Sequence, residues 1–156
     1  TIKPFLYALS MSNGMSPCDV APNVQRSYGN WTPRNGSRSR YGQMVTLKWG
    51  LAQSNNWISA YLMSRINPQD FLRILRDFGI NTYGVYPSIV LCLGPNEASV
   101  CEMVSAYTTF ANHGIHCSPM FVSKIEDNEG NVIATFQPRM NEVISEESAY
   151  ENARDA

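Results

Sequence analysis

Residues 46–79, TLKWGLAQSNNWISAYLMSRINPQDFLRILRDFG, contain three successive apolar stripes at helical spacing. Residues three and four apart share one face of a helix, so this stretch predicts two or three short helices. Asn67-Pro68 is typical of a helix start and Gly79 of a helix end. Ser54-Asn55-Asn56 is polar and predicts a turn between the first two helices. The stripes are Leu47 and Leu51; Ile58, Tyr61, Leu62 and Ile66; and Phe71, Ile74, Leu75 and Phe78.

Two further helices are predicted on either side of this stretch. Residues 97–113 give the strongest helical periodicity, which ends at Gly114. Residues 1–14 carry a second helical stripe and stop at Asn13-Gly14. Because a proline is tolerated only in the first turn of a helix, Pro4 places the start of this helix at or just before Thr1.

The remaining segments predict loops, one hairpin and a short final helix. Prolines and glycines make residues 15–45 and 80–96 irregular. Residues 119–137 predict a β-hairpin with strands over Met120–Ile125 and Val132–Phe136. The tail from Asn141 holds five acidic residues against Arg154 and predicts one more short helix. The chain is therefore expected to be α+β and mostly α-helical, with a hairpin.

Composition limits the class of protein. The 156 residues are 44 % hydrophobic, enough for the core of one domain or at most two small ones. A formal charge of −1 argues against an electrostatic nucleic-acid binder. No apolar run approaches the ~20 residues that span a bilayer, and we expect no signal peptide in this sequence. The start Thr-Ile-Lys-Pro, without Met, is expected of a piece cut from a longer chain.

The irregular segment between Val20 and Val45 combines arginine with aromatic residues. It contains no acidic residue. This pattern favours a long surface loop that lines a cleft and meets an anionic or amide-rich ligand, rather than a nucleic-acid surface. Its arginines are Arg26, Arg34, Arg38 and Arg40, and Tyr28, Trp31 and Tyr41 lie among them.

No metal or cofactor site is predicted. The four cysteines match no zinc or redox spacing, and we expect them to be small buried hydrophobes or to form one disulfide. The run from His113 through His116 to Cys117 has a metal-like composition, but no second cluster supplies a fourth ligand. We expect a solvated helix terminus there and no cofactor. The cysteines are Cys18, Cys92, Cys101 and Cys117.

Three polar residues are candidates for catalysis. Lys3 lies in the first turn of a helix, where the helix dipole disfavours a cation. If a serine stood three residues before it, a lysine with a lowered pKa would accept the serine's proton, as in a Ser-x-x-Lys site. Such sites also need a second hydroxyl and an amide, which Ser54 and Asn56 would supply.

The order of these motifs resembles the transpeptidase domain of penicillin-binding proteins. Two further segments make the chain similar to the bifunctional class A type, which also carries a glycosyltransferase domain. The resemblance covers residues 1–138, leaving 139–156 as an acidic tail. It rests on TIKPFLYA at 1–8, WTPRN at 31–35, YGQMVTL at 41–47, LAQSNN at 51–56, the segment from Gly94 to Asn112 with AYTTFAN at 106–112, and the hairpin Ser123–Val132.

The resemblance implies a fold and a reaction. The fold would be that of serine β-lactamases and transpeptidases, a helical subdomain beside a mixed α/β one. The whole protein would cross-link peptidoglycan stem peptides and bind β-lactams in the cell envelope, with a membrane anchor upstream of this segment. By position, Lys3 resembles the general base, Ser54 the proton relay and Asn56 the contact to the substrate amide.

Two elements of the family pattern are missing. The nucleophilic serine would stand just before Thr1, and no Lys-[Ser/Thr]-Gly occurs after Lys3, Lys48 or Lys124. The chain is therefore expected to be an inactive piece, mostly the helical part, that self-associates through its exposed hairpin. The alternatives are a β-lactamase or D,D-carboxypeptidase relative, a non-catalytic envelope module that binds cell-wall peptide, and a generic helical domain.

Overall fold

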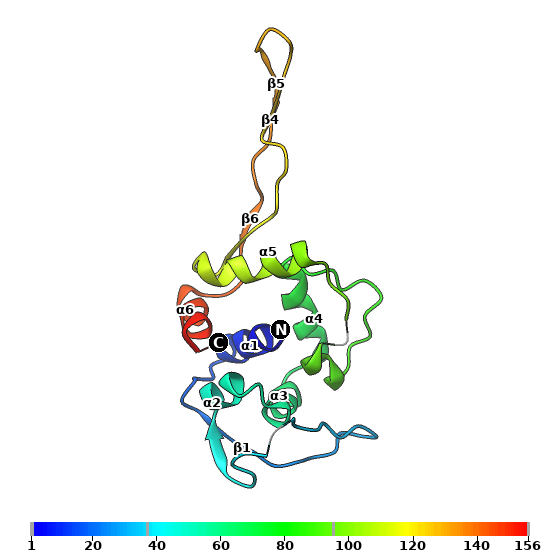
Figure 1. The fold of residues 1–156 in the computed structure, drawn as a ribbon, viewed down its shortest axis with the longest axis vertical. Coiled ribbons are helices and arrows are strands. Elements are labelled where there is room, and N and C mark those ends of the chain that lie inside the picture. The colour runs from blue at the N-terminus through cyan, green and yellow to red at the C-terminus, as the bar shows by residue number, and fades with distance from the viewer. Residues whose placement is uncertain (1, 37, 95, 156) are drawn as a thin grey trace.

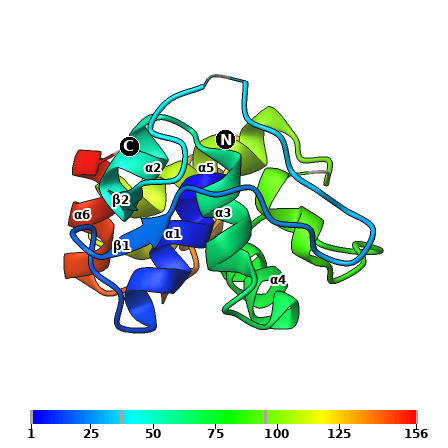
Figure 2. The ribbon, with the colours of Figure 1, turned by 90° about the horizontal axis from the view of Figure 1, so that it is seen from below.

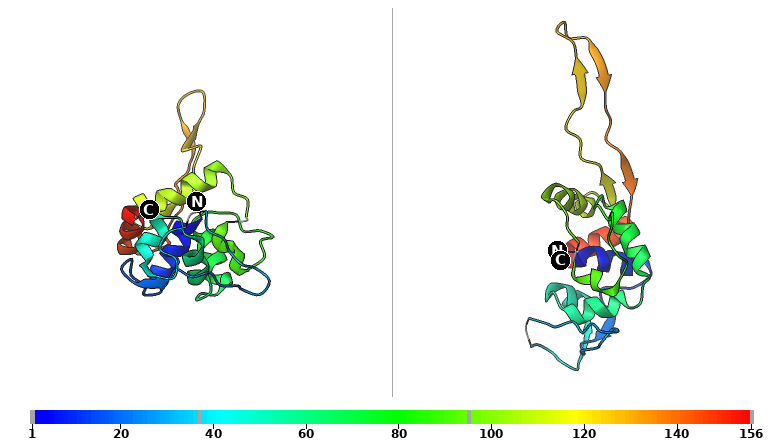
Figure 3. Two further views of the ribbon diagram at one scale, coloured as in Figure 1. Left: turned by 60° about the horizontal axis from the view of Figure 1, so that its bottom comes forward. Right: turned by 90° about the vertical axis from the view of Figure 1, so that its right-hand side faces the viewer.

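The computed structural model describes residues 2–36, 38–94 and 96–155. Its described part is a helical body from which a narrow β-arm projects (Figures 1 and 3). The helices are α1 (Lys3–Ser12), α2 (Leu47–Ala52), α3 (Asn56–Met63), α4 (Pro68–Asp77), α5 (Val100–Ala111) and α6 (Glu146–Asp155), with a 3₁₀ helix, η1, over Ile89–Leu93.

Helix α1 lies at the centre of the body, with α5 above it, α2 and α3 below it, α6 to its left and α4 to its right in Figure 1. Its residues from Lys3 to Met11 are buried. The Phe5 ring meets Phe78 edge-on at 4.8 Å between centroids and stacks on Phe110 at 5.6 Å. Replacing a buried phenylalanine by alanine destabilises the folded state by about 3–5 kcal/mol. This aromatic cluster therefore holds α1 against the end of α4 and against α5.

Glycine at position 50 brings α2 close to its neighbours. A Cβ on Gly50 would lie 2.8 Å from the Tyr7 hydroxyl and 2.9 Å from Cγ2 of Ile58. Only a residue without a side chain fits between α1 and α3 at this point. The turn that follows α2 is thereby held beside the start of α1.

The predicted helices are present with shifted ends. Thr1, where the sequence places the first helix start, lies outside the described residues, and α1 begins at Lys3. Helix α5 begins at Val100, three residues later than predicted, because Ser99 and Glu102 form a reciprocal capping box. The predicted final helix is confirmed as α6.

The strands differ more from the prediction. Residues 15–45 were expected to be irregular, but β1 (Val20–Pro22) pairs antiparallel with β2 (Met44–Thr46). The β-arm is built from two antiparallel pairs, of which the sequence predicts only the outer one. The inner pair is β3 (Ile115–Cys117) with β6 (Met140–Glu142), and the outer pair is β4 (Lys124–Glu126) with β5 (Val132–Thr135). Strand β4 begins four residues later than predicted and β5 ends one residue earlier, and the register shifts between Ile125 and Glu126.

The prediction for the cysteines is right for one of them. Cys92 is buried, but Cys18 and Cys101 are exposed and Cys117 is half-buried; all four are free thiols. Cys18 lies in the loop between α1 and β1, and Cys101 lies in the first turn of α5. Of the helices in the described ranges, none combines the length and apolar character that crossing a bilayer requires.

Candidate functional site

The Lys3 amine is the centre of the candidate site. Its Nζ donates to Asn56 Oδ1 at 2.7 Å, to Ser54 Oγ at 3.0 Å and to the Ser54 carbonyl oxygen at 2.5 Å. Residues more than fifty positions apart therefore meet at the start of α1. The structure brings together all three residues that the sequence singled out, Lys3, Ser54 and Asn56.

Burial makes the charged form of the Lys3 amine less favourable than it is in water. Its side chain is only 8 % exposed, and burial lowers the pKa of the amine below its usual 10.5. Among the described residues, no carboxylate forms an ion pair with it, and its three acceptors are neutral. A nearby thiol, Cys92, stays protonated because burial raises its pKa to about 12. A lowered pKa is what a lysine needs to serve as a proton acceptor.

Ser54 occupies the turn between α2 and α3 in a left-handed conformation, with φ of +49°. A non-glycine residue in this region costs of order 1 kcal/mol, which the surrounding contacts must offset. The backbone N–H of Asn55 donates to the Gly50 carbonyl oxygen at 2.9 Å and closes the turn. This conformation presents both the Ser54 carbonyl and its hydroxyl to one amine.

Asn56, the first residue of α3, is held from the opposite side. Its Nδ2 donates to the Arg34 carbonyl oxygen at 2.7 Å, and its backbone N–H donates to Asn35 Oδ1 at 2.7 Å. The amide nitrogen thus donates to the loop, and the amide oxygen accepts from Lys3. Because Lys3 Nζ is the donor in this contact, the orientation gives both ends of the Asn56 amide a hydrogen-bond partner.

A pair of buried asparagines fixes the loop beside the site. Asn55 Oδ1 accepts from the backbone of Trp57 and Ile58 as the N-cap of α3, while its Nδ2 donates to Asn23 Oδ1 at 3.0 Å. Asn23 Nδ2 in turn donates to the carbonyl oxygens of Ser39 and Arg40, at 2.8 and 2.9 Å.

The sequence did not single out Asn23, whose only signal is its place in a loop rich in asparagine. Asn35 was noted only as the last residue of the WTPRN segment, and no role was assigned to it. Asn55 was noted only as part of the predicted turn, a prediction that its capping role confirms.

The histidines lie elsewhere and separately. His116, on β3, is buried and shares a hydrogen bond with Ser105 Oγ at 3.0 Å, so the expectation of a solvated terminus is wrong for it. Strand β3 packs against α5 and carries the ring inward. His113 is exposed and pairs with Glu146 at 2.9 Å. No group of three or more metal-ligating side chains occurs within the described ranges.

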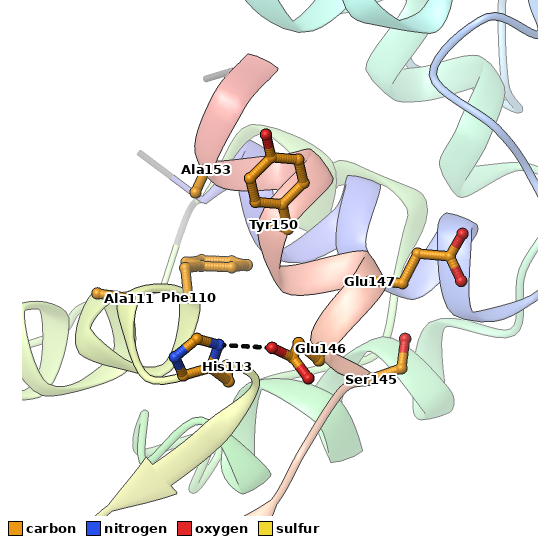
Figure 4. A pocket seen from close by; sticks show the side chains of 8 residues that line it. All are labelled: Phe110, Ala111, His113, Ser145, Glu146, Glu147, Tyr150 and Ala153. Atoms are coloured by element: carbon orange, nitrogen blue, oxygen red, sulfur yellow. Dashed lines mark ion pairs between the residues drawn. The ribbon is translucent and has the colours of Figure 1, made fainter.

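His113 lines the wall of a separate cavity of about 790 Å³ between α5 and α6 (Figure 4). Phe110 and Tyr150 form its apolar sides, and the ion pair between His113 and Glu146 lies at one end. None of Lys3, Ser54 and Asn56 belongs to this lining. The cavity is therefore distinct from the lysine site.

Comparison with known proteins gives a consistent set of relatives. The family model described as the penicillin binding protein transpeptidase domain matches residues 1–156. Penicillin-binding protein 1A of Neisseria meningitidis serogroup A is 31 % identical over 145 residues, which is 88 % of this chain and 18 % of that protein. The Aquifex aeolicus protein of the same name is 30 % identical over 149 residues, 92 % of this chain and 20 % of its own length. The chain thus spans about a fifth of these curated relatives.

Solved structures show the same fold. The crystal structure of penicillin-binding protein 1A from Haemophilus influenzae superposes with a TM-score of 0.84 at 24 % identity, covering 99 % of this chain and 28 % of that one. Penicillin binding protein 3 from Mycobacterium tuberculosis, solved with aztreonam, gives 0.82 at 19 % identity, covering 99 % of this chain and 39 % of that one.

Proposed function

Because the chain belongs to the penicillin-binding protein transpeptidase family, as a partial domain of the class A type, we propose that the whole protein is a serine D,D-transpeptidase whose proton transfers run through Lys3. The single observation that supports this role is the convergence of Ser54 Oγ and Asn56 Oδ1 on the buried Lys3 amine. The partners of the whole protein are then peptidoglycan stem peptides and β-lactams, at the cell envelope.

The proposed chemistry is acyl transfer. A serine three residues before Lys3 would lie one turn earlier on the same helix face, within reach of Nζ. Its hydroxyl attacks the carbonyl carbon of the D-Ala–D-Ala bond and passes its proton to the neutral lysine. The amide bond breaks, the terminal D-Ala amine leaves with a proton relayed through Ser54, and an acyl-enzyme remains. An amine from a second stem peptide then displaces the serine and restores its proton.

Asn56 has two roles in this scheme. Its Oδ1 holds the Lys3 amine, and its position beside the turn suits a contact to the amide of the bound peptide. The polypeptide of residues 1–156 alone has neither a serine at the required spacing before Lys3 nor a Lys-[Ser/Thr]-Gly sequence, which in the family supplies part of the oxyanion hole. Since one oxyanion donor is worth about 10²–10³ in rate, we expect this polypeptide by itself not to be acylated.

Covalent labelling with a fluorescent penicillin tests the proposal. In the whole protein, Lys3→Ala should slow labelling at least ~100-fold, the usual size of a general-base contribution. Lys124→Ala is the matched control, because Lys124 is an exposed lysine paired with Glu126 on the β-arm. Equal labelling rates for the Lys3→Ala variant and the unsubstituted protein would refute a catalytic role for the amine. Labelling of the 156-residue polypeptide would show that the nucleophile lies elsewhere.

A further inference from the structure

A polar groove lies next to the lysine site, on the side of the loop between β1 and β2. It encloses about 440 Å³, and its lining includes Arg34, Arg38, Tyr41 and Trp57. None of Lys3, Ser54 and Asn56 lines this groove. It is adjacent to the site, because the Arg34 carbonyl accepts from Asn56 and Trp57 follows Asn56 in α3. In Figure 2 this loop runs past α3 and then over α2, from blue to cyan.

The groove lies in a strongly basic part of the chain. Residues 20–69 contain six basic residues and no acidic one, whereas residues 70–156 contain five basic and twelve acidic residues. The near-neutral total therefore conceals two regions of opposite charge. A local excess of one sign raises the concentration of oppositely charged ligands at the surface.

Two arginines of the groove are available to a ligand. Arg34 and Arg38 are exposed, and within the described ranges neither forms an ion pair with a carboxylate. Arg73 on α4, by contrast, pairs with Asp70 at 3.3 Å. An unpaired guanidinium presents a planar set of donors that matches a carboxylate.

The wall and the loop of the groove are fixed in place. Tyr41 and Trp57 pack with ring centroids 4.4 Å apart, and the Trp57 Nε1–H donates to the Pro33 carbonyl oxygen at 3.0 Å. Asn23 holds the chain at Ser39 and Arg40, between the two arginines and Tyr41. The arginines therefore extend from an anchored segment, which lowers the entropy cost of binding.

We infer that this groove binds a carboxylate of an extended peptide whose scissile end lies at Lys3, Ser54 and Asn56. The inference rests on the proposed function, since it takes the peptide at the lysine site as the ligand. It adds that acidic peptides bind more tightly than amidated ones, and that Arg34 and Arg38 are the residues that determine this preference. An amidated peptide of the same length loses the charge-assisted contact but keeps the neutral ones.

The test compares two dye-labelled peptides that end in D-Ala–D-Ala, one with free side-chain carboxylates and the other with primary amides there. Their dissociation constants for the whole protein are measured by fluorescence polarisation at low and high salt. We expect about tenfold tighter binding of the acidic peptide, with the difference shrinking as salt rises. The double variant Arg34→Gln/Arg38→Gln should reduce the difference to about twofold or less.

The double variant Arg65→Gln/Arg73→Gln is the charge-matched control, because Arg65 lies over the Tyr61 ring and Arg73 pairs with Asp70. It should keep the full preference. Equal affinity of the unsubstituted protein for both peptides overturns the inference. So does a preference for the acidic peptide that remains in the Arg34→Gln/Arg38→Gln variant, or one that is lost in the Arg65→Gln/Arg73→Gln control. Equal weakening for both peptides also overturns it, since that marks a structural effect. Penicillin labelling of the unsubstituted protein, run in parallel, reports separately on the proposed function.

Discussion

Lys3 occupies an electrostatically unfavourable position, and this position indicates a role in proton transfer. A cation in the first turn of a helix opposes the helix dipole, and burial without a carboxylate partner among the described residues adds a desolvation cost. Three neutral acceptors, two of them from Ser54, make the position tolerable without restoring a full charge partner. The lowered pKa of the amine is the direct result, and it suits a proton acceptor.

A change at Asn56 should move the pH at which the reaction starts. Asn56→Asp places a carboxylate where the amide oxygen now accepts from Lys3, and an opposite charge at that distance raises the pKa of the amine by about one unit or more. Because the neutral amine is the proposed base, the rate of penicillin labelling rises with pH through this pKa. The variant's rising limb should therefore lie at higher pH than that of the unsubstituted whole protein.

Gln53→Glu is the control for this pH shift. It adds the same charge to the same turn at an exposed residue whose side chain has no hydrogen bond to Lys3 among the described residues. The rising limb of its pH profile should shift by less than half of the shift seen for Asn56→Asp. Superimposable pH profiles for Asn56→Asp and the unsubstituted protein would mean that the pKa of Lys3 does not determine the pH at which labelling begins to rise.

At the scale of elements, the α2–α3 turn and the loop between β1 and β2 form one unit. The turn supplies Ser54 and Asn56, and the loop returns through Arg34 and Asn35 to hold Asn56. Neither part is regular secondary structure over most of its length, so side-chain amides replace the backbone ladder that a sheet would give.

Asn23 is the residue whose loss should release the loop. Asn23→Ala removes two hydrogen bonds to the loop and leaves Asn55 Nδ2 without its acceptor. We expect trypsin to cut the whole protein after Arg38 and Arg40 about fivefold to tenfold faster, because local opening becomes easier by about 1 kcal/mol or more. Mass spectrometry of the early fragments measures this.

Asn30→Ala is the companion variant. Asn30 is exposed on the same loop, and its side chain makes no hydrogen bond within the described ranges. Cleavage after Arg38 should be unchanged in it. If both variants are cut at the rate of the unsubstituted protein, the buried asparagine pair does not control the loop.

The parts of the fold that could be predicted are those with a long repeated signal. Helix α5 carries its apolar stripe and its capping residues within the chain itself, and Ser54-Asn55-Asn56 indicates a turn by composition alone. The three-residue strands β1, β2, β3 and β6 are too short to show alternation, so their pairing depends on tertiary contacts. The same limit applies to Asn23, whose importance follows from neighbours distant in sequence.

At the scale of the whole molecule, the described chain divides into a well-buried helical body and a thin β-arm. The body has a continuous core around α1, whereas β4 and β6 are exposed throughout and β5 almost throughout. A two-stranded ribbon has no core of its own, and both of its edges offer unpaired backbone groups. Apolar residues on this arm are exposed on both of its faces, including Phe121 at 89 % and Ile133 at 67 %.

This arm should make the isolated 156-residue polypeptide self-associate. Burying several exposed apolar side chains against a second copy is favourable by roughly 25 cal/mol per Å², and edge pairing adds hydrogen bonds. Sedimentation at rising concentration should therefore show dimers or larger species, and Phe121→Ser/Phe136→Ser should shift the equilibrium toward monomer. Tyr83→Ser/Tyr86→Ser removes two comparably exposed aromatics from the segment after α4 and should leave the equilibrium unchanged. A monomer at every concentration would show that the twist and charges of the arm, such as the Lys124–Glu126 pair, already protect its edges.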